Sequence, residues 1–141
     1  MSRPEKGLVV DANILVRAAL GPRVRAVLRQ FHRTTSFWVP EVCRIDARRK
    51  IPEICGKRKL DQNEAIAAFD YVETTVEFVT PQTYAAWEQA ARKRILRDPD
   101  DWPIVATALS LELPIWTEDR DFFGCGVATW ITNMVEIYLR L

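Results

Sequence analysis

The sequence contains one histidine, His32, and three cysteines that form no C-x-x-C pair. A single histidine excludes sites that need several imidazoles, such as the H-E-x-x-H zinc motif. Cys43, Cys55 and Cys125 lack zinc-type spacing, so we expect reduced, buried thiols. His32 lies in a polar, basic stretch, where we expect a solvated side chain rather than the base of a nucleophilic triad.

Long apolar runs, internal repeats and Gly- or Ser-rich linkers are also missing. No apolar stretch is long enough to span a bilayer, and the N-terminal MSRPEK lacks the apolar core of a signal peptide. The hydrophobic share of 48% and the charged share of 28% are typical of a soluble globular protein. We therefore expect a cytoplasmic protein without a membrane partner, forming one domain over residues 1–141.

Short apolar runs alternate with helical patterns along the chain. Strands are predicted over residues 8–10, 37–39, 77–79 and 115–117, with a possible fifth over 127–130. Helices are predicted over residues 13–20, 22–31, 41–49, 61–76, 81–94, 104–111 and 133–139, with Pro52 and Gly56 interrupting or ending the third. The alternation predicts an α/β fold with a mostly parallel sheet of four to five short strands, covered on both faces.

Acidic residues follow two of the predicted strands. Asp11 stands directly after residues 8–10, and Asp119 lies just beyond residues 115–117. Because ligand sites in parallel sheets form beyond the carboxyl ends of the strands, both side chains should project from one edge. Asp101 precedes the apolar helix over 104–111, where it is also typical of a helix cap, and Asp119 is also typical of a turn.

Carboxylates gathered in this way would repel one another unless a cation neutralised them. Hard oxygen ligands without histidine or cysteine favour Mg²⁺ or Mn²⁺ over Zn²⁺. Such ions polarise a phosphoryl oxygen and activate water, so phosphodiester hydrolysis is the natural use of this site.

Basic residues cluster locally although the net charge is only +1. Arg44 and Arg48 are four residues apart and should share one helix face. If that face borders the acidic site, they would bind phosphates of the substrate. They are equally consistent with side chains that are solvated or paired with neighbouring acids.

Three segments carry a resemblance to a known family. They are residues 8–15 (LVVDANIL), 101–108 (DWPIVATA) and 115–122 (IWTEDRDF). In order, spacing and flanking residues the chain resembles the PIN-domain nucleases, especially the VapC-like toxin ribonucleases of type II toxin–antitoxin pairs. The resemblance implies a three-layer αβα fold, dependence on Mg²⁺ or Mn²⁺, and cleavage of RNA.

The resemblance also implies roles for individual residues. The catalytic acids would be Asp11, Asp46, Asp101 and Asp119, with Asp11, Asp101 and Asp119 as metal ligands; Asn13 and Thr117 would hydrogen-bond the ligands, Asp121 would be an auxiliary acid, and Asp100 is the alternate for Asp101. The family usually carries a Glu on the helix after the second strand, where this chain has Asp46. A cognate antitoxin covering the acidic pocket and a homodimer are also implied.

Two other functional classes remain open from the residues. A catalytically weak or inactive PIN module that binds RNA or a protein is suggested by the departure at Asp46. Phosphoryl transfer through an aspartyl nucleophile ranks last, because Asp11 is followed by Ala12-Asn13 and not by a second paired Asp.

Overall fold

A computed structural model describes residues 6–141, so most of the N-terminal segment considered above for a signal peptide lies outside the described residues. The chain forms a five-stranded sheet in which every pairing is parallel. The strands are β1 (Gly7–Val10), β2 (Ser36–Pro40), β3 (Glu77–Val79), β4 (Ile115–Trp116) and β5 (Thr129–Trp130), in the order β3-β2-β1-β4-β5. The predicted α/β fold with a parallel sheet is confirmed.

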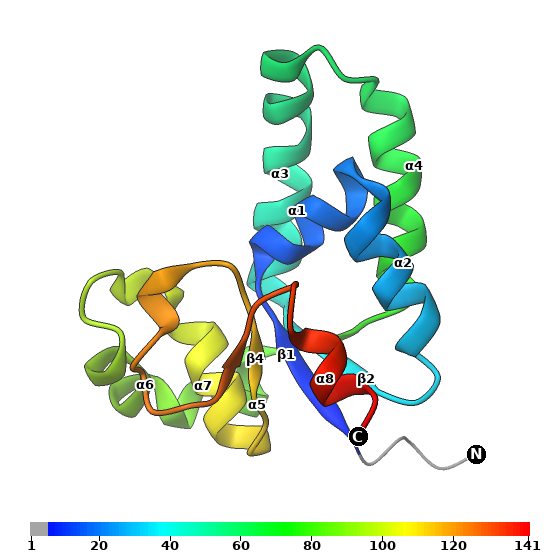
Figure 1. Cartoon of the computed structure of the whole chain (residues 1–141). Coiled ribbons are helices and arrows are strands. Elements are labelled where there is room, and N and C mark those ends of the chain that lie inside the picture. The colour runs from blue at the N-terminus through cyan, green and yellow to red at the C-terminus, as the bar shows by residue number, and fades with distance from the viewer. Residues whose placement is uncertain (1–5) are drawn as a thin grey trace.

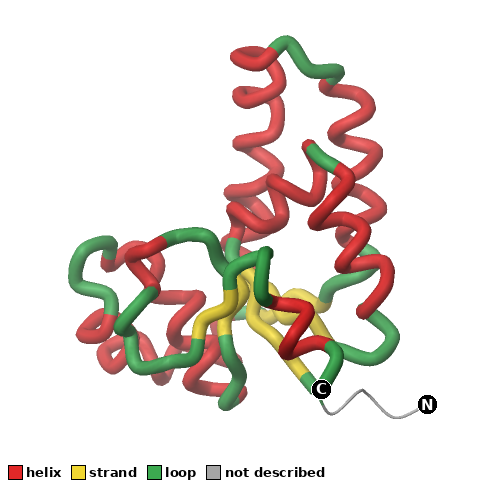
Figure 2. Tube along the Cα trace, viewed as in Figure 1, coloured by secondary structure: helices red, strands yellow, loops and turns green. Residues whose placement is uncertain are grey.

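Helices flank this sheet. They are α1 (Ala12–Leu20), α2 (Pro22–Phe31), α3 (Glu41–Arg58), α4 (Gln62–Glu73), α5 (Pro81–Tyr84), α6 (Glu88–Arg94), α7 (Trp102–Leu111) and α8 (Val135–Leu139), with short 3₁₀ turns η1 (Ala85–Trp87), η2 (Pro99–Asp101) and η3 (Arg120–Phe122). Figures 1 and 2 show α1 to α4 grouped on one side of the sheet and α5 to α7 on the other, with α3 and α4 extending as a long hairpin.

The central strand β1 is deeply buried in the core. Leu8, Val9 and Val10 have no exposed surface, which explains the uninterrupted apolar run in the sequence. The chain adds β2 and β3 on one side of β1, and later places β4 and β5 on the other. The gap between the ends of β1 and β4 is therefore the topological switch point, where open parallel sheets bind ligands.

Helix α3 corrects the prediction that Pro52 and Gly56 interrupt or end it near residue 49. It continues through both residues to Arg58 and ends at Lys59, whose φ of 55° is left-handed. Three buried residues at intervals of four, Ala47, Ile51 and Cys55, form the apolar stripe of this helix. Their packing outweighs the backbone hydrogen bond that Pro52 cannot donate.

The ends of several other helices and strands differ from the predicted ones for local reasons. The predicted helix over 81–94 is divided into α5, η1 and α6, and the predicted helix over 61–76 ends at Glu73, because Thr74 and Thr75 bond back to Tyr71 and Val72. Helix α7 begins at Trp102, two residues early, because Pro103 fits a first helical turn. The fifth strand is confirmed over Thr129–Trp130 alone, and the last helix begins at Val135.

All three cysteines are buried and free, as predicted. His32 is half-buried at the C-terminal cap of α2, not fully solvated. Within residues 6–141, no helix is both long enough and apolar enough to cross a bilayer.

Phe69 should be the main anchor between α4 and the rest of the helical layer. Its side chain is fully buried, and the Arg48 guanidinium lies 4.9 Å from its ring centroid. We expect Phe69→Ala to lower the free energy of unfolding in urea by about 3–5 kcal/mol, because the truncation leaves a cavity. The control Ile45→Ala, at a side chain that is 63% exposed, should change it by less than about 0.5 kcal/mol. Equal losses for the two variants would contradict this packing.

Candidate active site

The candidate site lies at the switch point between β1 and β4. Val10 pairs with Trp116 in parallel register, so the residues that follow the two strands emerge side by side. Asp11 comes directly after β1, Thr117 directly after β4, and Asp119 two residues later. The sheet therefore joins two segments that are about a hundred residues apart in sequence.

Asp11 holds the most buried carboxylate of this site, with 5% of its surface exposed. One oxygen accepts a hydrogen bond from the Ile14 backbone N–H at 3.0 Å and thereby caps α1. The other accepts a hydrogen bond from the Thr117 hydroxyl. Burial raises the pKa of Asp11 to about 6, although both hydrogen bonds act in the opposite direction and only the nearby charge of Asp119 adds to the rise.

Thr117 connects the two acidic segments. Its hydroxyl donates to Asp11, and its oxygen accepts a hydrogen bond from the Asp119 backbone N–H at 2.9 Å. Asp119 in turn accepts a hydrogen bond from the Asp121 backbone N–H at 2.9 Å, as in an Asx turn. Thr117 is fully buried, so both acids are held by a group that is itself fixed by packing.

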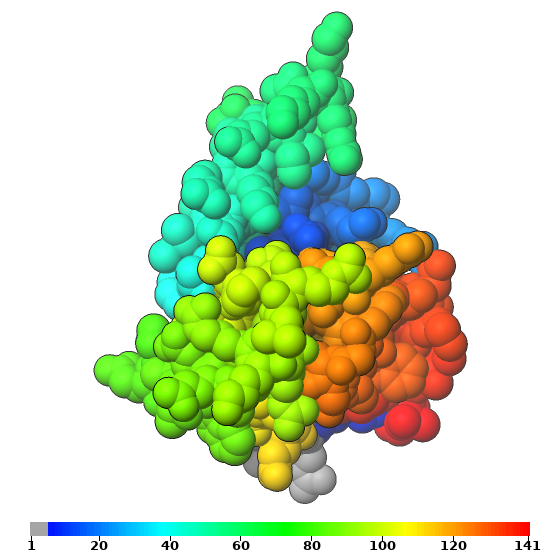
Figure 3. All heavy atoms as spheres, turned by 90° about the vertical axis from the view of Figure 1, so that its left-hand side faces the viewer, coloured from blue at the N-terminus to red at the C-terminus, as the bar shows by residue number. Residues whose placement is uncertain are grey.

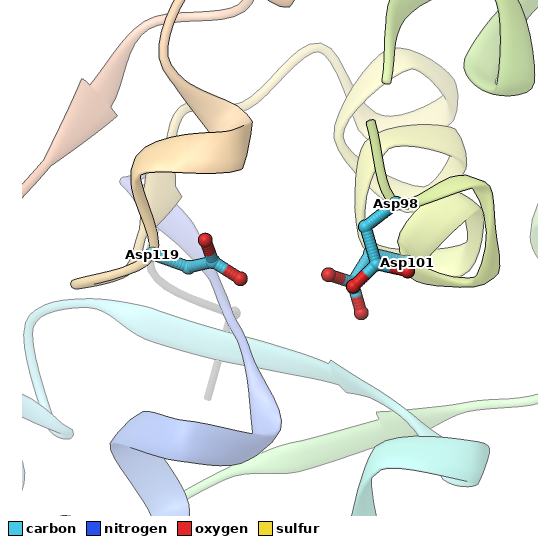
Figure 4. A group of neighbouring side chains, drawn as sticks. All are labelled: Asp98, Asp101 and Asp119. Carbon is cyan, nitrogen blue, oxygen red and sulfur yellow. The ribbon is translucent and has the colours of Figure 1, made fainter. Parts of the chain in front are cut away.

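Asp101 reaches the site from the start of α7. It occupies the helix N-cap position, as the cap interpretation predicts, but its side chain makes no capping hydrogen bond and is free to face the site. Carboxylate oxygens of Asp98, Asp101 and Asp119 lie within 4.8 Å of one another, and Figure 4 shows Asp119 facing the other two across a gap. Burial, and then the adjacent Asp98 carboxylate, raise the pKa of Asp101 to about 7.

Asp11, Asp101 and Asp119 line a small hollow of about 80 Å³, and Asp98 stands just outside this lining. Its walls come from α1, α3, η2, α7 and η3, and its polar lining residues are Asp11, Asn13, Cys43, Asp46, Lys50, Asp100, Asp101 and Asp119. We call this hollow the acidic pocket. Figure 3 shows the start of α1 (blue) between α3 (teal) and the yellow-green segment that contains α6 and η2.

The other predicted site residues differ in whether they line the acidic pocket. Asp46 lines the acidic pocket from α3, outside the group of three converging carboxylates, and accepts a hydrogen bond from Arg49 at 3.3 Å. Asn13 and Asp100 are exposed on its lining. Asp121 does not line it and forms an ion pair with Arg97 at 3.6 Å.

Arg44 and Arg48 share a helix face, as their spacing predicts, but that face is turned toward α4. Both arginines form ion pairs with Glu73, and the Arg48 pair measures 2.7 Å. Neither lines the acidic pocket. The structure thus favours the alternative that they pair with neighbouring acids.

Sequence reasoning missed two residues, Asp98 and Lys50. Asp98 stands in an acidic run with Asp100 and Asp101, but only the turn at Pro99 brings its carboxylate toward Asp119. Lys50 lies one helical turn beyond Asp46 on α3, a spacing that could have placed it on the same face. It is the one cation among the residues that line the acidic pocket.

The fold and the site define an α/β protein whose parallel sheet gathers carboxylates at its switch point. A sequence profile of the PIN domain matches residues 9–140, so the chain belongs to the PIN-domain family. A comparison with curated proteins gave no match.

Solved structures have the same fold at low sequence identity. The chain is similar to PAE2754 from Pyrobaculum aerophilum (TM-score 0.75, 17% identity), over 96% of this chain and 90% of that one. It is also similar to VapBC2 from Rickettsia felis, solved with a DNA fragment from its promoter (TM-score 0.68, 10% identity; 89% and 98% covered). A third similar structure is FitAcB from Neisseria gonorrhoeae (TM-score 0.63, 18% identity; 89% and 97% covered).

The donor set fits a hard divalent cation. Every converging ligand atom is a carboxylate oxygen, which Mg²⁺ and Mn²⁺ prefer. Cys43 also lines the acidic pocket, but it is outside the group of three converging carboxylates, and burial raises the pKa of its thiol well above the usual range. The raised pKa values of Asp11 and Asp101 have the same main cause, which is the burial of a negative charge away from water.

The buried Asp11 carboxylate should destabilise the metal-free protein at neutral pH. Its folded-state pKa of about 6 lies above the ordinary aspartate value of 3.8, so the native state holds the proton more tightly than the unfolded chain does. Below about pH 4 Asp11 therefore does not change the free energy of unfolding. As the pH rises to about 6, ionisation of Asp11 lowers the free energy of unfolding by up to about 3 kcal/mol.

We accordingly expect Asp11→Asn to unfold at higher urea than wild type at pH 8 in chelator, and at nearly the same urea at pH 4. The exposed N-cap variant Asp61→Asn, which keeps a good cap, should show no such pH-dependent gain. A lower stability of Asp11→Asn at pH 8 would contradict the burial argument.

Proposed function

We propose that this chain is an endoribonuclease that depends on Mg²⁺ or Mn²⁺ and acts as the toxin of a type II toxin–antitoxin pair. The observation that carries the proposal is the convergence of carboxylates from β1, β4 and η2 on one pocket in a PIN-domain chain. Hydrolysis of a phosphodiester is the reaction that such an oxygen-lined centre serves best.

Asp98, Asp101 and Asp119 would hold the cation, and Asp11 would face it from the end of β1. When bound, the cation neutralises these carboxylates, polarises a phosphoryl oxygen and lowers the pKa of water beside it. Thr117 and the Ile14 N–H fix both oxygens of Asp11, so this carboxylate needs little reorganisation during the reaction. Asp46 would contribute a further acid from the opposite wall, on α3.

The toxin assignment has its own support. The similar structures from Rickettsia felis and Neisseria gonorrhoeae are VapBC2 and FitAcB, and a further similar fold, from Klebsiella pneumoniae, is a toxin–antitoxin complex. We propose a cognate antitoxin that covers the acidic pocket. Val42, 40% exposed on its lining, offers apolar surface to such a partner.

A PIN module that binds RNA without cleaving it is the second candidate. It is favoured by Asp46, whose carboxylate lies outside the group of three converging acids. Titration with Mn²⁺ in a calorimeter separates the two candidates, because the inactive module should show no saturable metal binding.

Removal of one acid should abolish cleavage. We expect Asp119→Asn to lower the rate of RNA hydrolysis in Mn²⁺ by at least about 100-fold, because the variant removes a charged ligand at the point where charge develops. The matched control Asp61→Asn makes the same chemical change at an exposed site and should retain the wild-type rate. Equal cleavage by wild type and Asp119→Asn, or activity that survives chelator, would show that the site is assigned wrongly.

Thr117 should tune the affinity for metal without contacting it. Thr117→Val removes the hydroxyl that orients Asp11 and Asp119, and we expect Mn²⁺ affinity in calorimetry to fall about 10- to 100-fold. Thr117→Ser keeps the hydroxyl and should stay within a few-fold of wild type. If both variants bind Mn²⁺ as wild type does, the hydrogen bonds do not position the acids.

A further inference from the structure

Two more hollows continue from the acidic pocket along α1. The first, about 350 Å³, shares Asn13 and Asp119 with the acidic pocket and is also lined by Arg17 and Arg58. The second, about 440 Å³, shares Arg17 and Arg58 with the first and adds Arg23. The shared residues make the three hollows one continuous surface, and we call the part beyond the acidic pocket the arginine track.

The charge of this surface changes sign along its length. Asn13 and Arg17 are one helical turn apart on α1, so a single helix face passes from the acids to the arginines. Arg58 comes from the last turn of α3, and Arg23 from the first turn of α2. The acid Glu118 also lines the track, but its carboxylate accepts a hydrogen bond from the Thr132 backbone N–H at 2.7 Å.

The positive charges of Arg17 and Arg58, which the two hollows share, can bind an anionic ligand. Elsewhere in residues 6–141, six arginines form ion pairs with carboxylates, namely Arg44, Arg48, Arg49, Arg92, Arg97 and Arg140. Arg17 and Arg58 are exposed, and in the same described range neither forms an ion pair. Arg23 donates a hydrogen bond to Asn133, which is neutral.

We propose that Arg17 and Arg58 are positioning residues that bind the backbone phosphates of an RNA strand whose reactive phosphate lies in the acidic pocket. This inference rests on the proposed function. A polyanion needs cations along its length, and only the one phosphate that reaches the carboxylates needs a metal. An acidic peptide would be attracted by the arginines but repelled by Asp119, where the track joins the acidic pocket. A phosphodiester strand therefore fits the whole surface better.

Both arginines also lie in the last turns of helices, where a cation stabilises the helix dipole. The experiment must therefore separate binding from stability. The test variant is the double substitution Arg17→Gln, Arg58→Gln in the full chain. The control is Arg33→Gln, which removes one exposed arginine from the loop that enters β2. This loop lies at the amino-terminal ends of the parallel strands, whereas the acidic pocket lies at their carboxyl ends.

The first readout is binding of a fluorescein-labelled single-stranded RNA of about 12 nucleotides, measured by anisotropy over a salt series in the non-cleaving Asp119→Asn background. We expect the double variant to weaken binding about 10-fold or more. The slope of log affinity against log salt should become shallower by about 1.4, which is about 0.7 for each lost phosphate contact. Arg33→Gln should leave both values as they are, and thermal melting should show all variants folded.

The second readout uses the cleaving chain. The ratio of kcat/KM for the long RNA to kcat/KM for a dinucleotide should fall about 10-fold in the double variant, because only the long substrate reaches the track. The assignment is overturned if RNA affinity, salt slope and this ratio all equal those of wild type. It is also overturned if the double variant loses only melting temperature, or if it loses only affinity for an antitoxin peptide.

The outcome is separable from that of the proposed function. If wild type binds RNA with an arginine-dependent salt slope but cleaves nothing in Mn²⁺, the track stands and the nuclease proposal fails. If wild type cleaves RNA and the double variant shows the wild-type ratio, the nuclease stands and the track fails.

Discussion

The hydrogen-bonded hydroxyl of Thr117 is the contact on which the site depends. It donates to the Asp11 carboxylate and accepts from the Asp119 backbone amide, directly beyond two neighbouring strands. The parallel register of β1 and β4 fixes how close these groups come, because the core around Leu8 to Val10 leaves the strands no freedom to slide. A packed core thereby determines the positions of charged groups at its edge.

Charge is the second constraint on this protein. The chain compensates several arginines with carboxylates on helix surfaces, as Glu73 does for Arg44 and Arg48, yet it leaves the acids of the pocket close together and partly desolvated. Such an arrangement lowers the stability of a fold at neutral pH and favours the binding of a cation. The same separation of charge continues along α1, where acids give way to Arg17 and Arg58, neither of which forms an ion pair within residues 6–141.

Much of the fold could be read from the sequence because local patterns and tertiary packing agree. The apolar run at residues 8–10 forms a buried strand, and the apolar residues at 104–111 lie in a helix, both as predicted. Pro52 is the exception. Its local effect is to break a helix, but the buried stripe of Ala47, Ile51 and Cys55 keeps α3 continuous, and only the neighbouring helices create the interior that buries that stripe.

The sequence by itself determined which residue types were available for the site and which strand ends would carry them. It favoured Asp11, Asp119 and Asp101, since apolar runs and a helix start mark their positions. Only the tertiary structure decided that Asp98 joins them, that Asp46 stands apart and that Arg44 and Arg48 turn to Glu73. The physical reason is that a side chain's partners depend on distances across elements, which a turn such as Pro99 or a helix pair such as α3 and α4 sets independently of spacing along the chain.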